Sequence, residues 1–382
     1  MKILIIGGTG TISKAIADAA VSANYDVTLV NRGNSSFRNN KLCKVVTGDI
    51  YKLQELDNKL REEFYDVIVD PITYSLEELK NRLWFYKKHC KLYVFISSVA
   101  AIGSGNGIQD ERSQKNPVWS YGINKLACEN FLKEQHELTY MILRPSITYG
   151  DIRIPIPVAC RKNPYTVIDR IKNEKPLVCF RLSDDENRKH KLMDVRDFGT
   201  YSVALLNKVN AQNNDFIICA DKAYSWNEAY DALYNKLNKK KCIYEVDRDA
   251  FKVLDSALYD DLTYDKDAAN VLYSKEKCNQ YTGLNIRETE LEEGISNLVD
   301  YLEKVYKNRI LEEEYNLMSD YLLLHYAKRD DTLNKYLNTF TDEYKNKLNN
   351  YYKNKIIQIR KNRSFLYRGY RIAKKILNKL FR

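Results

Sequence analysis

The chain has 382 residues, of which 44% are hydrophobic, so it can bury a core and global disorder is excluded. The formal net charge of +10 is carried entirely by residues 301–382, which hold 19 basic and 9 acidic side chains. A basic net charge suggests binding to a nucleic acid or to a membrane surface. Because the charge is confined to the C-terminal part, such a partner is considered for that part alone.

Eight cysteines are dispersed along the chain without a Cys-x-x-C pair. This pattern predicts reduced, mostly buried thiols rather than a disulfide framework, and it predicts no metal site. The first apolar run is too short for a signal peptide, and no run approaches the ~20 apolar residues of a membrane span. We therefore expect a cytoplasmic protein.

The first 150 residues alternate short apolar runs with amphipathic ones. Such alternation predicts strands buried on both faces of a parallel sheet and helices that cross over between them. The expected strands are 2–6, 26–30, 44–47, 66–70, 92–97 and 140–143, and the expected helices are 13–22, 75–88 and 121–135. The predicted fold class is therefore α/β, a Rossmann-type doubly wound parallel sheet.

Prolines interrupt this rhythm after residue 150. The expected strands there are 177–180, 216–219 and 243–246, and the expected helices are 195–206, 226–237 and 286–305, which together predict a smaller α/β lobe. From residue 308 onward there is no proline and a single glycine, which predicts an all-helical extension. We therefore divide the chain into a dinucleotide-binding domain (1–150, to which later segments return), a mainly substrate-binding lobe (151–305) and a basic helical extension (306–382).

A glycine-rich loop, Gly7-Gly8-Thr9-Gly10-Thr11-Ile12-Ser13, follows the first expected strand. Glycines are needed where backbone approaches a pyrophosphate, and the helix that follows offers free amides and the positive end of its dipole. Gly7 and Gly10 occupy the first two positions of a G-x-x-G-x-x-G loop, and Ser13 occupies the third. We expect cofactor contacts from Gly7, Thr9, Gly10, Thr11 and Ile12.

The second expected strand leads into Asn31-Arg32-Gly33. An NAD site usually has an acidic residue here, which accepts hydrogen bonds from the ribose hydroxyls. Neutral Asn31 removes the charge that would repel a 2′-phosphate, and Arg32 can pair with that phosphate, assisted by Ser36. NADP(H) is therefore favoured and NAD(H) is the alternative. Asp49 and Ile50, after the third strand, are expected beside the adenine.

Ser97 and Ser98 close the fifth expected strand, and Tyr121 stands four residues before Lys125 on the next helix. That spacing puts the last two side chains on one helix face. A tyrosine with a pKa near 10 needs a neighbouring cation to act as an acid–base group at neutral pH. A serine hydroxyl can hydrogen-bond the substrate oxygen. We expect catalysis by Ser98, Tyr121 and Lys125, with Ser97, Tyr121 and Lys125 also contacting the cofactor.

These motifs, in this order, resemble the extended short-chain dehydrogenase/reductase superfamily, of the NAD-dependent epimerase/dehydratase type that acts on nucleotide sugars. The resemblance covers about residues 1–305 and also rests on segments 143–150, 194–197 and 284–294. It implies a nucleotide-sugar substrate and selects Ser98, five residues before Gly103, over Ser97 as the catalytic serine. A homodimer is expected from this resemblance alone.

Two departures from the family pattern bear on the reaction and the substrate. Family dehydratases have an Asp-Glu pair where this chain has Val99-Ala100, so a 4,6-dehydratase is not expected. The family often has an arginine for the substrate diphosphate where this chain has His190, inside a basic stretch. The resemblance implies Ser98, Arg144 and His190 as substrate contacts, and a solvated surface position is the alternative for His190.

The catalytic set serves two reactions on a nucleotide sugar. A 4-keto sugar reductase, which would act in surface-polysaccharide precursor synthesis, transfers hydride from NADPH to the keto carbon, and Tyr121 protonates the oxygen. A 4-epimerase uses the same groups to oxidise C4 and reduce it from the other side. Arg32 favours the reductase, because net reduction draws on NADPH whereas an epimerase recycles its cofactor. A non-catalytic NADP-sensing or RNA-binding protein is a further alternative, disfavoured by the retained Tyr121 and Lys125.

Residues 344–382 contain 13 basic residues and no acidic one. On a helical wheel, residues 365–382 place apolar side chains on one half and almost only cations on the other. One hypothesis is a terminal helix docked on its own enzyme or on a sister subunit. Another is peripheral contact of residues 360–382 with an anionic inner membrane surface. Nucleic acid is the least favoured partner, because it has little use for so aliphatic a face.

Overall fold

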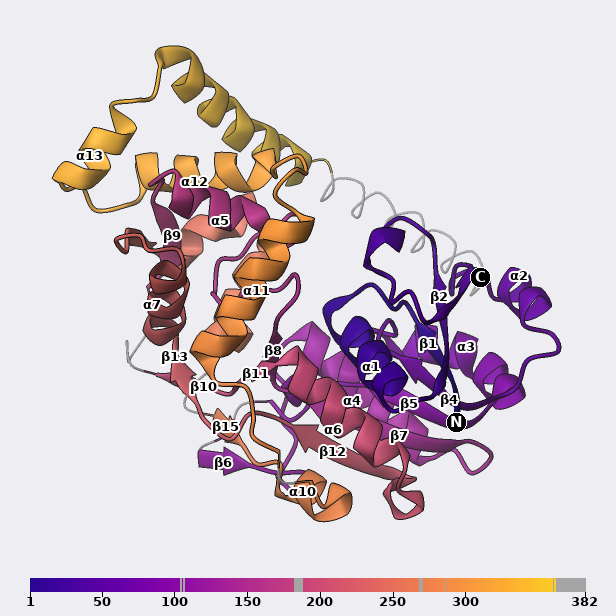
Figure 1. Cartoon of the computed structure of the whole chain (residues 1–382). Coiled ribbons are helices and arrows are strands. Elements are labelled where there is room, and N and C mark those ends of the chain that lie inside the picture. The colour runs from indigo at the N-terminus through magenta and orange to yellow at the C-terminus, as the bar shows by residue number, and fades with distance from the viewer. Residues whose placement is uncertain are drawn as a thin grey trace, which may run out of the picture.

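A computed structural model describes residues 1–103, 105, 107–181, 188–267, 271–284, 286–359 and 361. Its centre is a sheet of seven parallel strands in the order β12-β7-β5-β4-β1-β2-β3 (Figure 1). The strands are β1 Lys2–Ile6, β2 Asp26–Asn31, β3 Lys44–Thr47, β4 Tyr65–Asp70, β5 Cys90–Ile96, β7 Thr139–Pro145 and β12 Asn214–Ile218. The order runs outward from β1 in both directions, which confirms the Rossmann-type prediction.

Helices cover both faces of this sheet, as the alternation within β1 shows. Ile3 and Ile5 share a buried cluster with residues of α1 and α6, whereas Leu4 and Ile6 share another with residues of α3 and α4. Successive side chains of a strand point to opposite faces, so a run of apolar residues fills two cores at once. These helices, with the short α2, are α1 Thr11–Ser22, α2 Leu53–Lys59, α3 Leu76–His89, α4 Ser120–Lys133 and α6 Val195–Leu206.

The structure corrects two boundaries that the sequence predicted. The strand expected at 216–219 spans Asn214–Ile218 and pairs with β7, so it belongs to the large sheet and not to the smaller lobe. The helix expected from residue 286 begins at Leu291. Thr289 donates its backbone N–H and its hydroxyl to the Asp197 carboxylate, at 2.8 and 3.3 Å, and this anchoring holds the preceding residues outside the helix.

The smaller lobe is built from short elements. The strands β9 and β14 form one parallel pair and β8 and β11 another, while α5, α7 and α11 pack around them. The bounds are β8 Ile147–Tyr149, β9 Leu177–Phe180, β11 Leu192–Asp194, β14 Ile243–Val246, α5 Tyr165–Lys172, α7 Trp226–Lys236 and α11 Leu291–Val305. The remaining short elements are β6 Gly107–Gln109, β10 Lys189–His190, β13 Tyr224–Ser225, α8 Phe251–Leu254, α9 Ser256–Asp261, β15 Val271–Tyr273 and α10 Glu276–Thr282.

The described part of the extension is helical and docks on the smaller lobe (Figure 1). It comprises α12 Glu313–His325, α13 Asp331–Leu337 and a helix over 342–359. The buried Arg170 of α5 donates to Asp320 of α12 at 2.8 Å, and the hydroxyls of Tyr336 and Tyr344 donate to the same carboxylate. Leucines and aromatic rings of the extension belong to the same hydrophobic cluster as α5, α7 and α11, so the two parts share one core.

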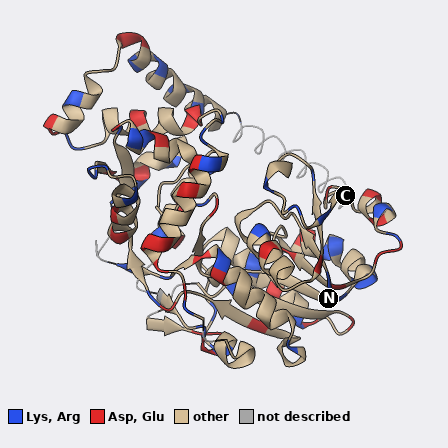
Figure 2. Ribbon diagram, in the orientation of Figure 1, with Lys and Arg blue, Asp and Glu red and all other residues tan. Residues whose placement is uncertain are grey.

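The cationic amphipathic stretch 365–382 lies outside the described residues, so its partner stays a hypothesis. Figure 2 shows basic and acidic residues intermixed on the ribbons of both lobes. Among the described residues, no helix is long and apolar enough to cross a membrane.

Candidate active site

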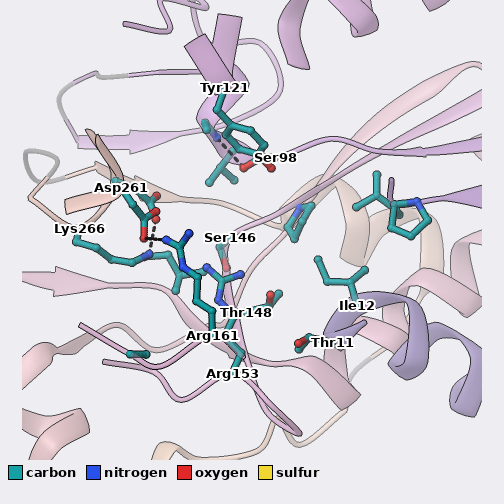
Figure 3. Close-up of a pocket in the computed structure, with 18 of the residues that line it drawn as sticks. Thr11, Ile12, Ser98, Tyr121, Ser146, Thr148, Arg153, Arg161, Asp261 and Lys266 are labelled. Atoms are coloured by element: carbon teal, nitrogen blue, oxygen red, sulfur yellow. Dashed lines mark hydrogen bonds and ion pairs between the residues drawn. The ribbon is translucent and has the colours of Figure 1, made fainter. Parts of the chain in front are cut away.

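A cavity of about 570 Å³ opens between the large sheet and the smaller lobe. Thr11 and Ile12 line it from the start of α1, and Ser98 and Tyr121 line it from above in the view of Figure 3. The smaller lobe contributes Arg153, Arg161, Asp261, Asp265 and Lys266. The cavity therefore lies at the carboxyl ends of β1, β5 and β7, the edge at which open parallel sheets bind their ligands.

Tyr121 and Lys125 lie on α4 as the spacing predicts, and both line this cavity. The Lys125 ammonium lies 5.8 Å from the centre of the Tyr121 ring. It donates to the backbone carbonyls of Thr73 and Ile96, each at 2.8 Å. An ammonium has three donors, so one remains for a ligand. Burial lowers the pKa of Lys125 to about 8, which leaves it largely protonated at neutral pH.

Burial raises the pKa of Tyr121 to about 12, and a hydrogen bond with Ser98 works in the opposite direction. The charge of Arg153 also lowers this pKa. The phenol therefore keeps its proton near neutral pH in this environment, and a further positive charge beside it is required before it can lose that proton and act as a base.

The two neighbouring serines have different surroundings. The Ser98 hydroxyl accepts a hydrogen bond from the backbone N–H of Ala100 at 3.2 Å and remains at the cavity beside Tyr121. The Ser97 hydroxyl is buried and donates to Glu129 at 2.6 Å. The structure thus brings Ser98 rather than Ser97 to the tyrosine, although Ser97 also borders the cavity.

Asp70 is a buried residue of this site that sequence reasoning missed. Its carboxylate accepts from the hydroxyls of Tyr86 and Tyr93 and from both the N–H and the hydroxyl of Thr73. Thr73 in turn gives its carbonyl to Lys125, and the charge of Asp70 raises the pKa of that lysine against the effect of burial. The last residue of an apolar strand gave no sequence signal for such a network.

A second cavity, of about 170 Å³, lies beyond the glycine loop and gathers most of the residues expected around the adenosine half of the cofactor. Gly7, Thr9, Asn31, Arg32, Asp49 and Ile50 all line it. Gly10 adjoins it and accepts through its carbonyl from the backbone N–H of Lys14. Ser36 begins a short turn just outside, and Ser35 lines the cavity in its place.

The surroundings of Asn31 and Arg32 differ in a way that bears on cofactor choice. The Asn31 amide is engaged, because its oxygen accepts from Gly33 and its nitrogen donates to Asn39. Arg32 is exposed at the cavity and forms no ion pair among the described residues. A guanidinium is therefore free to meet an anion at this end of the cavity.

Arg144 does not reach the cavity, which corrects the expectation that it contacts substrate. Its side chain is fully buried and forms ion pairs with Glu129, at 2.6 Å, and with Asp215. Breaking a buried ion pair to free one partner is strongly unfavourable. Arg144 therefore joins α4 to β12 and holds the sheet edge together.

His190 is also absent from the cavity lining, because its ring is buried and stacked on Trp226 with 4.4 Å between ring centres. Burial lowers its pKa to about 3, so the imidazole is neutral at physiological pH. Neither a diphosphate contact nor the solvated alternative describes this position. The cation that lines the cavity here is Lys266, whose ammonium lies 5.8 Å from the Trp226 ring centre.

The cations that the smaller lobe contributes to the cavity come from irregular segments. Lys266 ends a π-helical turn, Leu262–Lys266, and pairs with Asp265. Arg161 pairs with Asp261 at 3.2 Å (Figure 3). Arg153 is exposed and forms no ion pair among the described residues. None of these positions belongs to a periodic pattern, so the sequence offered no means of selecting them from other basic residues.

A family model and a curated protein each match more than half of the chain. A model of the NAD dependent epimerase/dehydratase family matches residues 3–219. A curated protein of Methanocaldococcus jannaschii, described as a putative UDP-glucose 4-epimerase, is 27% identical over 273 residues, which is 65% of this chain and 86% of that protein.

Solved structures share the fold at low sequence identity. UDP-glucose 4-epimerase of Thermotoga maritima, solved with UDP-glucose, superposes with a TM-score of 0.60 at 18% identity, over 80% of this chain and 99% of its own. UDP-glucuronic acid 4-epimerase of Bacillus cereus, solved with NAD, superposes with a TM-score of 0.62 at 17% identity, over 81% of this chain and 99% of its own. UDP-glucose 4-epimerase of Thermus thermophilus, also solved with NAD, superposes with a TM-score of 0.63 at 15% identity, over 80% of this chain and 100% of its own.

Proposed function

Because this chain belongs to the NAD-dependent epimerase/dehydratase family, we propose that it transfers hydride between a nicotinamide dinucleotide and C4 of a nucleotide-linked sugar. The observation that carries this proposal is the convergence of Ser98, Tyr121 and Lys125 on one cavity between the lobes. We further propose 4-epimerisation of a UDP-sugar as the reaction, supported by the Methanocaldococcus relative.

The residues at the glycine loop fit a dinucleotide. Gly8 has a φ of +89°, and a Cβ there would lie 2.8 Å from Leu29, so only glycine lets the loop pack this closely against β2. The helix α1 begins at Thr11 without a side-chain cap. Its first-turn amides are therefore open to a pyrophosphate, as in other helix N-termini that bind phosphate.

The chain's own groups account for the proton transfers. A bound nicotinamide ring supplies the hydride acceptor and, for the return step, the hydride donor. Tyr121 takes the proton from the C4 hydroxyl and later returns it to the oxygen, while Ser98 hydrogen-bonds that oxygen. Lys125, held by two carbonyls, places its positive charge beside the phenolate. Epimerisation requires the keto sugar to turn within this cavity before it is reduced from its other face.

The substrate diphosphate is assigned in this proposal to Arg153, Arg161 and Lys266. All three line the cavity opposite the glycine loop, and Figure 3 shows the two arginines side by side below Ser146. A diphosphate is matched by guanidinium groups, which can donate two parallel hydrogen bonds to its oxygens. These residues take the role that the sequence suggested for His190 and Arg144.

A reductase is the second candidate, supported by the cationic end of β2. Arg32 and the neutral Asn31 suit the 2′-phosphate of NADP(H), a cofactor that net reduction consumes and epimerisation recycles. The solved relatives from Bacillus cereus and Thermus thermophilus are described with NAD, so NAD(H) stays the alternative cofactor. The homodimer, the cytoplasmic location and the membrane contact through residues 360–382 stay predictions.

Incubation with UDP-glucose or UDP-galactose and catalytic amounts of NAD⁺ or NADP⁺ separates the two candidates. An epimerase interconverts the two sugars without net change in cofactor absorbance. A reductase instead oxidises NADPH in proportion to an added UDP-4-keto sugar. Absence of both activities, together with absence of dinucleotide binding, would exclude the proposal.

A further inference from the structure

Residues 306–309, at the start of the extension, contact the loop that follows β2. The Arg309 guanidinium lies 3.5 Å from the centre of the Phe37 ring, and the Tyr306 ring meets the same ring edge-on at 5.9 Å between centres. Phe37 lies two residues after the segment 32–35 that lines the adenosine-side cavity. The extension therefore begins with a contact to the loop that borders the proposed cofactor site.

The next residues of the extension contact a different segment, the stretch 158–166 of the smaller lobe. The buried Tyr315 hydroxyl donates to the backbone carbonyl of Val158 at 3.0 Å. The Asn163 side chain donates to the carbonyl of Ile310 at 2.9 Å, and the backbone N–H of Glu312 donates to the hydroxyl of Thr166 at 2.9 Å. Three hydrogen bonds thus join three residues of the extension, Ile310, Glu312 and Tyr315, to one short stretch.

Ion pairs reinforce this junction at its exposed side. The Lys162 ammonium lies 3.3 Å from a carboxylate oxygen of Glu312 and 3.4 Å from one of Glu314. Exposed ion pairs contribute little individually. The three hydrogen bonds, each of which involves a backbone group, therefore contribute most to holding residues 310–315 against the stretch 158–166.

The same stretch forms a wall of the proposed substrate cavity. Pro157, Ala159, Cys160 and Arg161 line that cavity, and Figure 3 shows Arg161 beside Arg153. Ala159, Cys160 and Arg161 also line a smaller cavity of about 170 Å³ on the side of α12. The wall therefore separates two cavities. Its buried residues Val158 and Cys160 pack in the core of the smaller lobe, and the hydrogen bonds made by the extension fix its backbone on the side of α12.

We propose that residues 306–315 are a brace whose positioning residues, Arg309 and Tyr315, fix the cofactor loop and the substrate-cavity wall respectively. Tyr315 sets the position of Arg161 through Val158, three residues away along the wall. The brace therefore governs how tightly the ligands bind and leaves the chemical step, made by Tyr121 and Ser98, unchanged. The substrate arm of this proposal rests on the proposed function; the cofactor arm requires only that the chain binds a dinucleotide.

Point variants test the brace better than truncation, because the extension shares a core with the smaller lobe and its removal would expose that core. Tyr315→Phe removes one buried hydrogen bond while keeping the ring. Arg309→Ala removes the contact with Phe37. Tyr344→Phe is the matched control, because its hydroxyl also comes from the extension and donates to Asp320 at 2.8 Å, away from both cavities.

Steady-state kinetics with UDP-glucose, dinucleotide titrations and hydrogen exchange are compared for the three variants and wild type. Tyr315→Phe should raise KM for UDP-glucose about threefold to tenfold, the range expected for one hydrogen bond, with kcat and dinucleotide Kd unchanged. Arg309→Ala should weaken dinucleotide binding by about threefold and leave KM for UDP-glucose unchanged. Tyr344→Phe should change neither constant.

Hydrogen exchange separates failure of the brace from failure of the proposed function. Tyr315→Phe should speed amide exchange in residues 158–163 more than in the rest of the smaller lobe, whatever the substrate proves to be. If wild type does not act on UDP-glucose, faster exchange of this wall still supports the brace. Equal effects of Tyr315→Phe and Tyr344→Phe on exchange and on KM would overturn it, because the extension would then act only through general stability.

Discussion

The two sides of the cavity are built in different ways. On the large-sheet side, Ser98, Tyr121 and Lys125 stand at the end of a strand or on a long helix, and buried carbonyls fix the lysine. On the smaller-lobe side, the charged groups come from loops and a π-helical turn. Under the proposed function, the chemistry rests on rigid, regular elements, whereas substrate recognition rests on irregular segments that can vary without disturbing it.

Replacement of Tyr121 tests the sheet side of this comparison most severely. Tyr121→Phe keeps the ring but removes the proton that is exchanged with substrate, so turnover should fall by about 10² or more. Dinucleotide Kd, measured by fluorescence titration, should stay near wild type. Turnover within a few-fold of wild type would exclude Tyr121 from the chemistry.

Replacement of Arg153 tests the smaller-lobe side. Arg153→Ala removes from the cavity a guanidinium that forms no ion pair within the described part of the chain. A charged hydrogen bond of this kind is worth about tenfold or more in affinity. KM for UDP-glucose should rise accordingly while kcat changes little. Arg144→Lys serves as contrast, because that buried position should affect thermal stability rather than KM. An unchanged KM in Arg153→Ala would remove Arg153 from substrate binding.

Replacement of Asp70 tests how the charges on the sheet side set the pKa of Lys125. The Asp70 charge raises the pKa of Lys125, so Asp70→Asn should lower it further from its value of about 8. The protonated lysine is the active form, so the loss of activity with rising pH should move to lower pH, and activity at pH 8 should fall several-fold. Tyr93→Phe removes one donor to the same carboxylate but keeps its charge, and it should leave the alkaline limb of the pH–rate profile in place.

Arg32 also belongs to the sheet side, where it follows β2 and lines the adenosine-side cavity. NADPH should bind at least about tenfold more tightly than NADH, and Arg32→Ala should remove most of that difference by abolishing the pairing with the 2′-phosphate. Calorimetric titration of both dinucleotides against both proteins measures it. Equal dissociation constants in wild type would favour NAD(H) and, with it, the epimerase over the reductase.

His190 should give the smallest functional effect. Its neutral ring packs on Trp226 away from the cavity, so His190→Gln should leave KM for UDP-glucose within about twofold. The loss of a stacked pair should instead lower the unfolding free energy by about 1 kcal/mol, measurable by thermal or denaturant unfolding. A large rise in KM without loss of stability would restore His190 as a substrate contact.

The sequence predicted the sheet side closely because its signals are local. The strand at residues 2–6 and the helix over 195–206 have the predicted bounds, and the four-residue spacing placed Tyr121 and Lys125 together. Other positions on both sides of the cavity depended on side-chain contacts that no local pattern reveals. Arg144 resembled a site residue until its pairing with Glu129 and Asp215 was known, and Asp70 acts through Thr73, a link that no periodicity reveals.

The shared core of the smaller lobe and the extension has a consequence for synthesis on the ribosome. The large sheet has all seven strands once residue 218 has been made, whereas the core around β9 also includes Leu348. At bacterial-like elongation rates, on the order of ten to thirty seconds separate translation of β9 from translation of its last partners. During that interval the apolar residues of β9 lack part of their partners, so the nascent chain should depend on a chaperone at this stage more than at any earlier one.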